Sequence, residues 1–115
     1  MSVHSFTTRH GGDEIVVTMG WDRPLQGYFM TITRIDSNPE GNTEDEEKHF
    51  LFNNLEQYIT HPKGIEGYLF ELGQRRIHVP EQMISEVIMD GISNVGNKYV
   101  IHRFENGKHV REQTL

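Results

Sequence analysis

The chain contains no cysteine and no alanine among its 115 residues. The absence of cysteine excludes disulfide bonds, thiolate metal sites, iron–sulfur clusters and thiol nucleophiles. The absence of alanine, with ten isoleucines and eight valines against six leucines, favours sheet over helix, because β-branched side chains pack well on a pleated surface.

Long apolar runs are also missing. No stretch approaches the ~20 apolar residues that a membrane-spanning helix requires. Residues 1–10 are polar and lack the apolar segment of a secretory signal peptide. We therefore expect a soluble, cytoplasmic protein with no membrane association.

The negative charge is concentrated in one segment. The chain has 17 acidic and 11 basic side chains, a formal charge of −6. Residues 40–47 hold five of the acids and no base, which leaves 12 acids against 11 bases elsewhere. Such a run usually forms a solvated loop, so we expect an acidic loop over residues 36–47. The alternative is an acidic contact surface for a basic partner.

Alternation of apolar and polar residues, or a compact apolar run, predicts strands. The two glycines within residues 10–13 can supply the positive φ of a tight hairpin between the strands predicted at residues 3–8 and 14–19. Residues 108–115 can form a returning edge strand or a frayed tail. The strand predicted at residues 49–52 has a helix as its alternative, with Leu51, Leu55, Tyr58 and Ile59 as the apolar positions. The predicted strands are residues 3–8, 14–19, 27–35, 49–52 and 98–104.

Two helices are predicted within residues 64–91. Apolar residues at i, i+3, i+4 and i+7 run from Ile65 to Leu72, followed by Gly73 as a left-handed cap. Pro80 is expected to begin the second helix, which ends at Asp90-Gly91.

The order of these elements indicates the fold class. It is ββββααβ, without the alternating βαβ rhythm of a parallel sheet. We expect one α+β domain over residues 1–115, with a mainly antiparallel sheet of four to six strands and two helices on one face. Residues 98–104 form its C-terminal strand.

The most distinctive segment is Gly20-Trp21-Asp22-Arg23-Pro24-Leu25, followed by an aromatic strand. It resembles a strand–turn–strand segment of small, uncharacterised bacterial proteins. The likeness extends loosely to residues 50–55 and 90–100, which include Asn94-Val95-Gly96-Asn97. The resemblance implies a bacterial, cytoplasmic origin, and it supplies no catalytic residue.

Two roles are open for this segment. In the first, Pro24 and the flanking glycines serve the turn itself, with Trp21 and Leu25 folded inward. In the second, an exposed aromatic and guanidinium patch binds a partner, as such residues do at interface hot spots. The exposure of Trp21 distinguishes the two. The candidate binding residues are Trp21, Asp22, Arg23, Gln26 and Tyr28.

Seven histidines raise the question of a metal site. None lies at the spacing of a known ligand motif, so we expect no metal and no cofactor. A site made by His4, His10 and His102 across neighbouring strands depends on an unknown register. His102 alternates with Val100 and Phe104, which favours a neutral, hydrogen-bonded imidazole on the inner face.

Motifs for catalysis and nucleic-acid binding are weak. No serine has a Gly-x-Ser-x-Gly setting, and no phosphate-binding glycine loop occurs, so no catalytic residue is assigned. The second predicted helix is acidic and carries no lysine or arginine, which argues against sequence-specific DNA binding. The C-terminal strand region does carry four cationic residues among aromatic ones, Lys98, Arg103, Lys108 and Arg111. This pattern occurs in proteins that bind single-stranded nucleic acid, and also in edge strands whose charges block pairing with other strands.

The sequence thus predicts a non-enzymatic binding module that acts through protein–protein contacts. The alternative is a small enzyme or ligand-binding protein with a polar site near Asp22, Arg23 and His102. A weaker alternative is single-stranded nucleic-acid binding by the C-terminal strand. Homodimerisation through an exposed strand edge is a further expectation.

Overall fold

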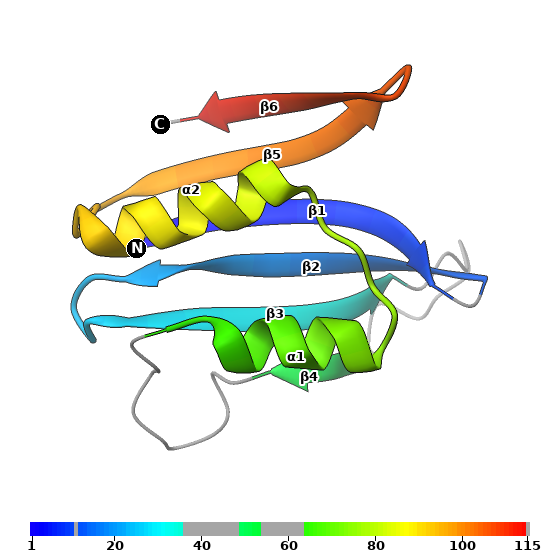
Figure 1. Cartoon of the computed structure of the whole chain (residues 1–115), viewed down its shortest axis with the longest axis horizontal. Coiled ribbons are helices and arrows are strands. Elements are labelled where there is room, and N and C mark those ends of the chain that lie inside the picture. Colours follow the sequence, from blue (N-terminus) through cyan, green and yellow to red (C-terminus); the bar gives the residue numbers. More distant parts are fainter. Residues whose placement is uncertain (11, 36–48, 54–63, 115) are drawn as a thin grey trace, which may run out of the picture.

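The structure is a computed structural model that describes residues 1–10, 12–35, 49–53 and 64–114 (Figure 1). These residues form one six-stranded sheet in the order β4-β3-β2-β1-β5-β6, together with two helices. The elements are β1 (Ser2–His10), β2 (Asp13–Asp22), β3 (Gly27–Ile35), β4 (His49–Asn53), α1 (Glu66–Gln74), α2 (Glu81–Ile92), β5 (Lys98–Glu105) and β6 (Lys108–Thr114).

The sheet is mixed. Strands β1 to β4 form an antiparallel meander, and β5 and β6 form an antiparallel hairpin. The two halves join where β5 lies parallel to β1, with His4 beside Val100. A parallel pairing needs a long crossover, and the segment that carries α1 and α2 provides it. The α+β prediction is confirmed, and six strands lie within the expected four to six. The sheet is mixed rather than antiparallel throughout, and β6 follows the strand that ends the order ββββααβ.

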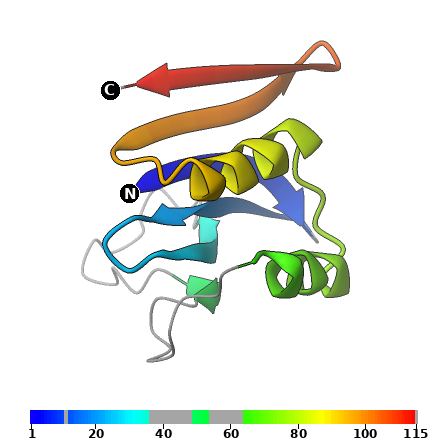
Figure 2. The same cartoon turned by 60° about the vertical axis from the view of Figure 1, so that its left-hand side comes forward.

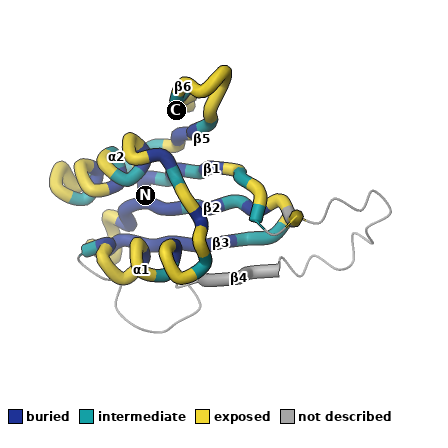
Figure 3. The backbone as a smooth tube through the Cα atoms, turned by 45° about the vertical axis from the view of Figure 1, so that its right-hand side comes forward, coloured by how far each residue is buried: buried dark blue, intermediate teal, exposed yellow. Residues whose placement is uncertain are grey.

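Both helices lie over the same face of the sheet (Figure 2). α2 packs on β1 and β2 through Met83 and Val87, while α1 contributes Tyr68 and Leu72 to the same core. Figure 3 shows that much of β2 and β3 is buried. The residues that β1, β2 and β3 contribute to this core are Phe6, Ile15, Val17, Met19, Trp21, Tyr28, Met30 and Ile32.

The strand predictions are largely confirmed. Gly12 has φ of +89° in the turn between β1 and β2, as a tight hairpin requires. Residues 49–53 are a strand, and the rival helix through Leu55 extends into residues outside the described part of the chain. The C-terminal segment is an ordered edge strand, β6, because it pairs with β5 from Lys108 to Thr114.

The helix ends differ from the prediction. Gly73 lies inside α1, and the left-handed residue after this helix is Arg76, with φ of +56°. α2 continues past Gly91 to Ile92, and Asn94 adopts φ of +50°. Both ends are local backbone caps, because the N–H of Ile77 donates to the oxygen of Leu72 and the N–H of Val95 donates to the oxygen of Asp90. The left-handed position of each cap is held by a residue other than the glycine that the sequence pattern favoured.

The acidic loop over residues 36–47 lies outside the described residues. Within the described ranges, neither helix has the length and apolar character needed to span a membrane.

Replacing Gly20 with alanine tests the close contact between the first two strands. A Cβ atom at Gly20 would lie 1.8 Å from the backbone oxygen of Ser2, so the strands must move apart. We expect Gly20→Ala to lower the free energy of unfolding by about 1–3 kcal/mol in urea titrations. Gly67→Ala is the control, because a Cβ there meets no atom within 4 Å and favours the helix. Equal stability of the two variants would contradict the predicted contact.

Candidate functional site

The aromatic residues of the 21–28 segment are buried. Trp21 is 6% exposed and Tyr28 is 5% exposed, and their rings meet edge to face with centroids 4.9 Å apart. Trp21 pairs with Tyr28 across β2 and β3, on the face that the helices cover. Of the two roles left open for this segment, the burial of both rings fits the first, in which Trp21 folds inward and the segment serves the turn, and it rules out an exposed patch made by these two aromatic rings.

The polar residues of this segment hold the turn and the loop after α2. The indole Nε1–H of Trp21 donates to Oδ1 of Asn94 over 3.0 Å, and the side-chain amide of Gln26 donates to the same oxygen over 2.7 Å. Oδ1 of Asp22 accepts the backbone N–H of Leu25. Within residues 21–28 the exposed residues are Arg23, Pro24, Leu25 and Gln26. Leu25 is 62% exposed, so it does not fold inward as predicted.

The alternative polar site near Asp22, Arg23 and His102 is not assembled in one place. His102 lies beside Phe6, which pairs with Val17 on β2. Asp22 lies five residues beyond Val17 along β2, so about 16 Å of strand separates Asp22 from the part of the sheet where His102 lies. His102 belongs to a different group of residues, which includes His4.

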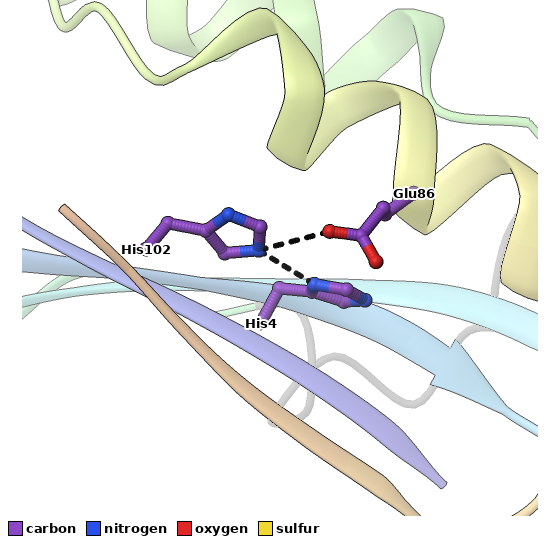
Figure 4. A group of neighbouring side chains, drawn as sticks. All are labelled: His4, Glu86 and His102. Carbon is purple, nitrogen blue, oxygen red and sulfur yellow. Dashed lines mark hydrogen bonds and ion pairs between the residues drawn. The ribbon is translucent and has the colours of Figure 1, made fainter. Parts of the chain in front are cut away.

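The parallel pairing of β1 with β5 creates this group. It places His4 and His102 on adjacent strands and on the same sheet face, which α2 covers with Glu86 and Asp90. Figure 4 shows the two imidazoles and the Glu86 carboxylate pointing toward one another. His4 is 0% and His102 is 1% exposed. We call His4, Glu86, Asp90, Lys98, His102, His109 and Arg111 the histidine–acid cluster.

A continuous hydrogen-bonded chain runs through the cluster. Nε2 of His4 lies 2.6 Å from Oδ2 of Asp90, and Nδ1 of His4 lies 2.8 Å from Nε2 of His102. Nδ1 of His102 lies 2.9 Å from Nε2 of His109, whose ring stacks on that of His102. The chain thus joins a buried carboxylate to the half-buried His109 on the edge strand.

The charges define the direction of these hydrogen bonds. An ionised Asp90 can only accept, so Nε2–H of His4 donates to it. When His4 is neutral, its Nδ1 accepts from Nε2–H of His102, and Nδ1 of His102 in turn accepts from Nε2–H of His109. Movement of a proton from His109 to Asp90 reverses all three bonds in turn, so the arrangement can transmit a proton between these two residues.

Two basic residues balance the two carboxylates. Nζ of Lys98 donates to Oδ1 of Asp90 over 2.8 Å, and the Arg111 guanidinium makes two bonds of 2.9 and 2.8 Å to the oxygens of Glu86. Burial raises the pKa of Asp90, but hydrogen bonds from His4 and Lys98 outweigh it and hold that pKa below 3.8. Burial likewise raises the pKa of Glu86, and the bond and charge of Arg111 bring it below 4.5.

His102 is kept neutral. Burial, and then the neighbouring His4 ring, lower the pKa of His102 from 6.5 to about 4. The hydrogen-bonded, neutral imidazole predicted for this residue is therefore present on the inner face.

An open pocket lies beside the cluster, between α2 and the β5–β6 hairpin. Its volume is about 740 Å³. Glu86, Lys98, His109 and Arg111 connect it to the buried chain. The full lining is Glu81, Gln82, Ser85, Glu86, Lys98, His109, Arg111 and Gln113.

The sequence indicated only part of this site. Of the cross-strand trio His4, His10 and His102, the structure brings together the first and last, while Nε2 of His10 lies 2.6 Å from the backbone oxygen of Arg75. Glu86 and Asp90 are four residues apart and so share a helix face, which is the one signal that could have linked them. The C-terminal cations are largely engaged, because Lys98, Arg103 and Arg111 pair with carboxylates.

Comparisons with protein-family models, with curated proteins and with solved structures found no match. The residues and their geometry therefore carry the functional argument.

Stability should fall in mild acid because of His102. Below pH 6.5 the unfolded chain protonates this residue, while the folded chain keeps it neutral until about pH 4. The free energy of unfolding should therefore drop as the pH falls through this window, by about 3 kcal/mol for this group. Urea titrations measure the drop, and an NMR titration of the histidine rings assigns it. A His102 ring that titrates near pH 6.5 would contradict the prediction.

Trp21 and Leu25 should respond differently to truncation. Trp21→Ala removes a buried ring and its hydrogen bond to Asn94, so we expect a loss of about 3–5 kcal/mol of unfolding free energy. Leu25→Ala is the matched control in the same turn, and because Leu25 is 62% exposed we expect a change within about 0.5 kcal/mol. Thermal denaturation followed by circular dichroism compares them. Similar losses would show that the inward and outward assignments are wrong.

Proposed function

We propose that the protein is a non-enzymatic binding module that takes an extended segment of a partner protein along the free edge of β6. The observation that carries the proposal is an unpaired strand edge lying directly beside a pocket. β6 ends the described sheet, and no described strand lies beyond it (Figure 1). Such an edge presents backbone donors and acceptors that an added strand can satisfy.

The hairpin geometry identifies the outward-facing backbone groups. Asn106 and Gly107 have φ of +53° and +78°, as in a two-residue type I′ turn. The closing pair Glu105 and Lys108 then exchanges hydrogen bonds, and the pattern alternates along the ladder. The backbone groups of His109, Arg111 and Gln113 therefore point away from β5.

The same three residues line the pocket with their side chains. A strand added to β6 would place every second side chain on the pocket side of the sheet. Gln82, Ser85 and Gln113 offer neutral hydrogen-bonding groups there, beside the charges of Glu86 and Arg111. Backbone pairing would supply affinity, and a polar side chain entering the pocket would supply specificity.

The charges of β6 favour a different chain over a second copy of this one. Antiparallel pairing of two β6 strands about their midpoint would oppose Arg111 to Arg111. Lys108 and Glu112 add charge to the same edge, a device that limits self-association of edge strands. We therefore assign the edge to a heterologous partner segment.

The shape of the pocket favours binding over catalysis. Enzyme sites usually enclose most of a small substrate, whereas this pocket is open to solvent along the sheet edge. The enzyme alternative is supported by the hydrogen-bonded chain that ends at His109 in the pocket, since a positioned imidazole can act as a general base.

A random-peptide display library tests the proposal. Wild-type protein should enrich peptides with a shared extended motif, and a labelled consensus peptide then gives an affinity by fluorescence anisotropy. Gln113→Pro removes one outward N–H, and we expect about a tenfold loss of affinity. Gln113→Ala keeps that N–H, so its backbone contact is retained and a smaller loss is expected.

Three outcomes would overturn the proposal. The first is no enrichment above an unrelated protein, and the second is equal affinity of the Pro and Ala variants. The third is a wild-type dimer in analytical ultracentrifugation that Gln113→Pro converts to a monomer, which would assign the edge to a second copy.

A further inference from the structure

Three side chains of the histidine–acid cluster converge on one point beneath the pocket. They are Nδ1 of His4, Nε2 of His102 and Oε2 of Glu86, and they come from β1, β5 and α2 (Figure 4). Their donor atoms all lie within 4.8 Å of one another. We propose that these three residues bind a divalent transition-metal ion, with Zn²⁺ as the ion that the donor set fits best.

The distances suit a small ion after a modest adjustment. Zinc bonds to nitrogen and oxygen are ~2.0–2.1 Å long, so donors around a tetrahedral ion lie ~3.3 Å apart. Nδ1 of His4 and Nε2 of His102 are 2.8 Å apart, and Nε2 of His102 lies 3.8 Å from Oε2 of Glu86. These two values lie on either side of the tetrahedral spacing. The third distance, from Nδ1 of His4 to Oε2 of Glu86, is within 4.8 Å, so the Glu86 carboxylate has to approach His4 by up to about 1.5 Å to reach the same ion.

Each proposed ligand already has an outer partner. Metal-binding histidines commonly donate their other ring N–H to a carboxylate or another acceptor, which orients the ring. The second nitrogen of His4 contacts Asp90, and the second nitrogen of His102 contacts His109. Arg111 holds both oxygens of Glu86, and each carboxylate oxygen keeps a further lone pair. Two histidines that only filled space in the core would need fewer hydrogen-bond partners than His4 and His102 have with Glu86 beside them.

Metal binding needs only a change of tautomer. Nδ1 of a neutral His4 already presents a lone pair, because its proton is on Nε2 beside Asp90. The proton on Nε2 of His102 must move to Nδ1, and the proton on Nε2 of His109 moves to its own Nδ1. The bond between His102 and His109 then runs in the opposite direction. No net proton has to leave the neutral chain.

The donor types and local charge define the class of ion. Two imidazoles and one carboxylate suit Zn²⁺ and related transition metals, whereas Mg²⁺ and Ca²⁺ prefer oxygen donors. Glu86 and Asp90 are balanced by Lys98 and Arg111, so the ion brings uncompensated charge. A fourth ligand from the pocket side, such as hydroxide or an anionic group, would reduce that charge. This inference does not depend on strand addition at β6.

Metal titration of tag-free, chelator-treated protein tests the site. Isothermal titration calorimetry with Zn²⁺ should give one ion per chain, and Co²⁺ should give the visible absorption of a tetrahedral complex. Glu86→Gln should weaken Zn²⁺ binding at least about tenfold, because it removes a charged ligand. His109→Ala leaves all three ligands in place and should weaken it about 10-fold to 100-fold.

His78→Gln is the matched control, since His78 is exposed and lies outside the cluster. Its affinity for Zn²⁺ should equal that of the wild type. Circular dichroism and metal-free thermal denaturation confirm that each variant is folded. His102→Ala is not used, because it leaves a cavity in the core and can unfold the chain.

The proposal is wrong if the wild type shows no saturable binding, or if folded Glu86→Gln and His109→Ala both bind Zn²⁺ like the wild type. Binding that is lost in His78→Gln would place the ion elsewhere and would also overturn it. None of these outcomes alters the peptide experiment, so the two proposals fail separately.

Discussion

The parallel pairing of β1 with β5 is the constraint on which the rest of the structure depends. It joins the antiparallel meander to the C-terminal hairpin, and it requires the long crossover in which both helices lie. It also places His4 and His102 side by side under α2. Without this pairing the sheet would end at β1, and β6 would have no position next to the pocket.

The histidine–acid cluster explains how α2 is held over this pairing. Apolar contacts through Met83 and Val87 allow sliding, because they are non-directional. The hydrogen bonds from Asp90 to His4 and Lys98 are directional and buried, so a shifted helix would leave ionised groups without partners. Lys98 pairs with Asp90 and Arg111 pairs with Glu86, which offsets part of the cost of burying these carboxylates. The cluster thus specifies the position of the helix and, at the same time, assembles the candidate site.

Much of the fold could be predicted from local patterns, and the site could not. Apolar patterns located the predicted strands within three residues at each end, and the i, i+4 spacing of apolar residues located both helices. The helix ends were missed because the left-handed residue after α1 is Arg76, a residue type that rarely takes this conformation, and because glycine was given priority over Asn94 after α2. The direction of Leu25 was missed because a turn residue has no periodicity that reports burial. His4 and His102 were considered together, although their partners on α2 and β6 were not.

What the sequence by itself determined was the chemistry available and the elements present. The lack of cysteine excluded thiol sites, and the pattern of apolar residues defined an α+β protein. Only the tertiary structure decided which elements are neighbours, and therefore that residues 98 positions apart share a hydrogen bond. The physical reason is that periodicity reports which face of a strand or helix is buried, because burial is a local requirement of each element. It carries no information on the partner that buries that face, since strand order and register depend on the packing of the whole chain.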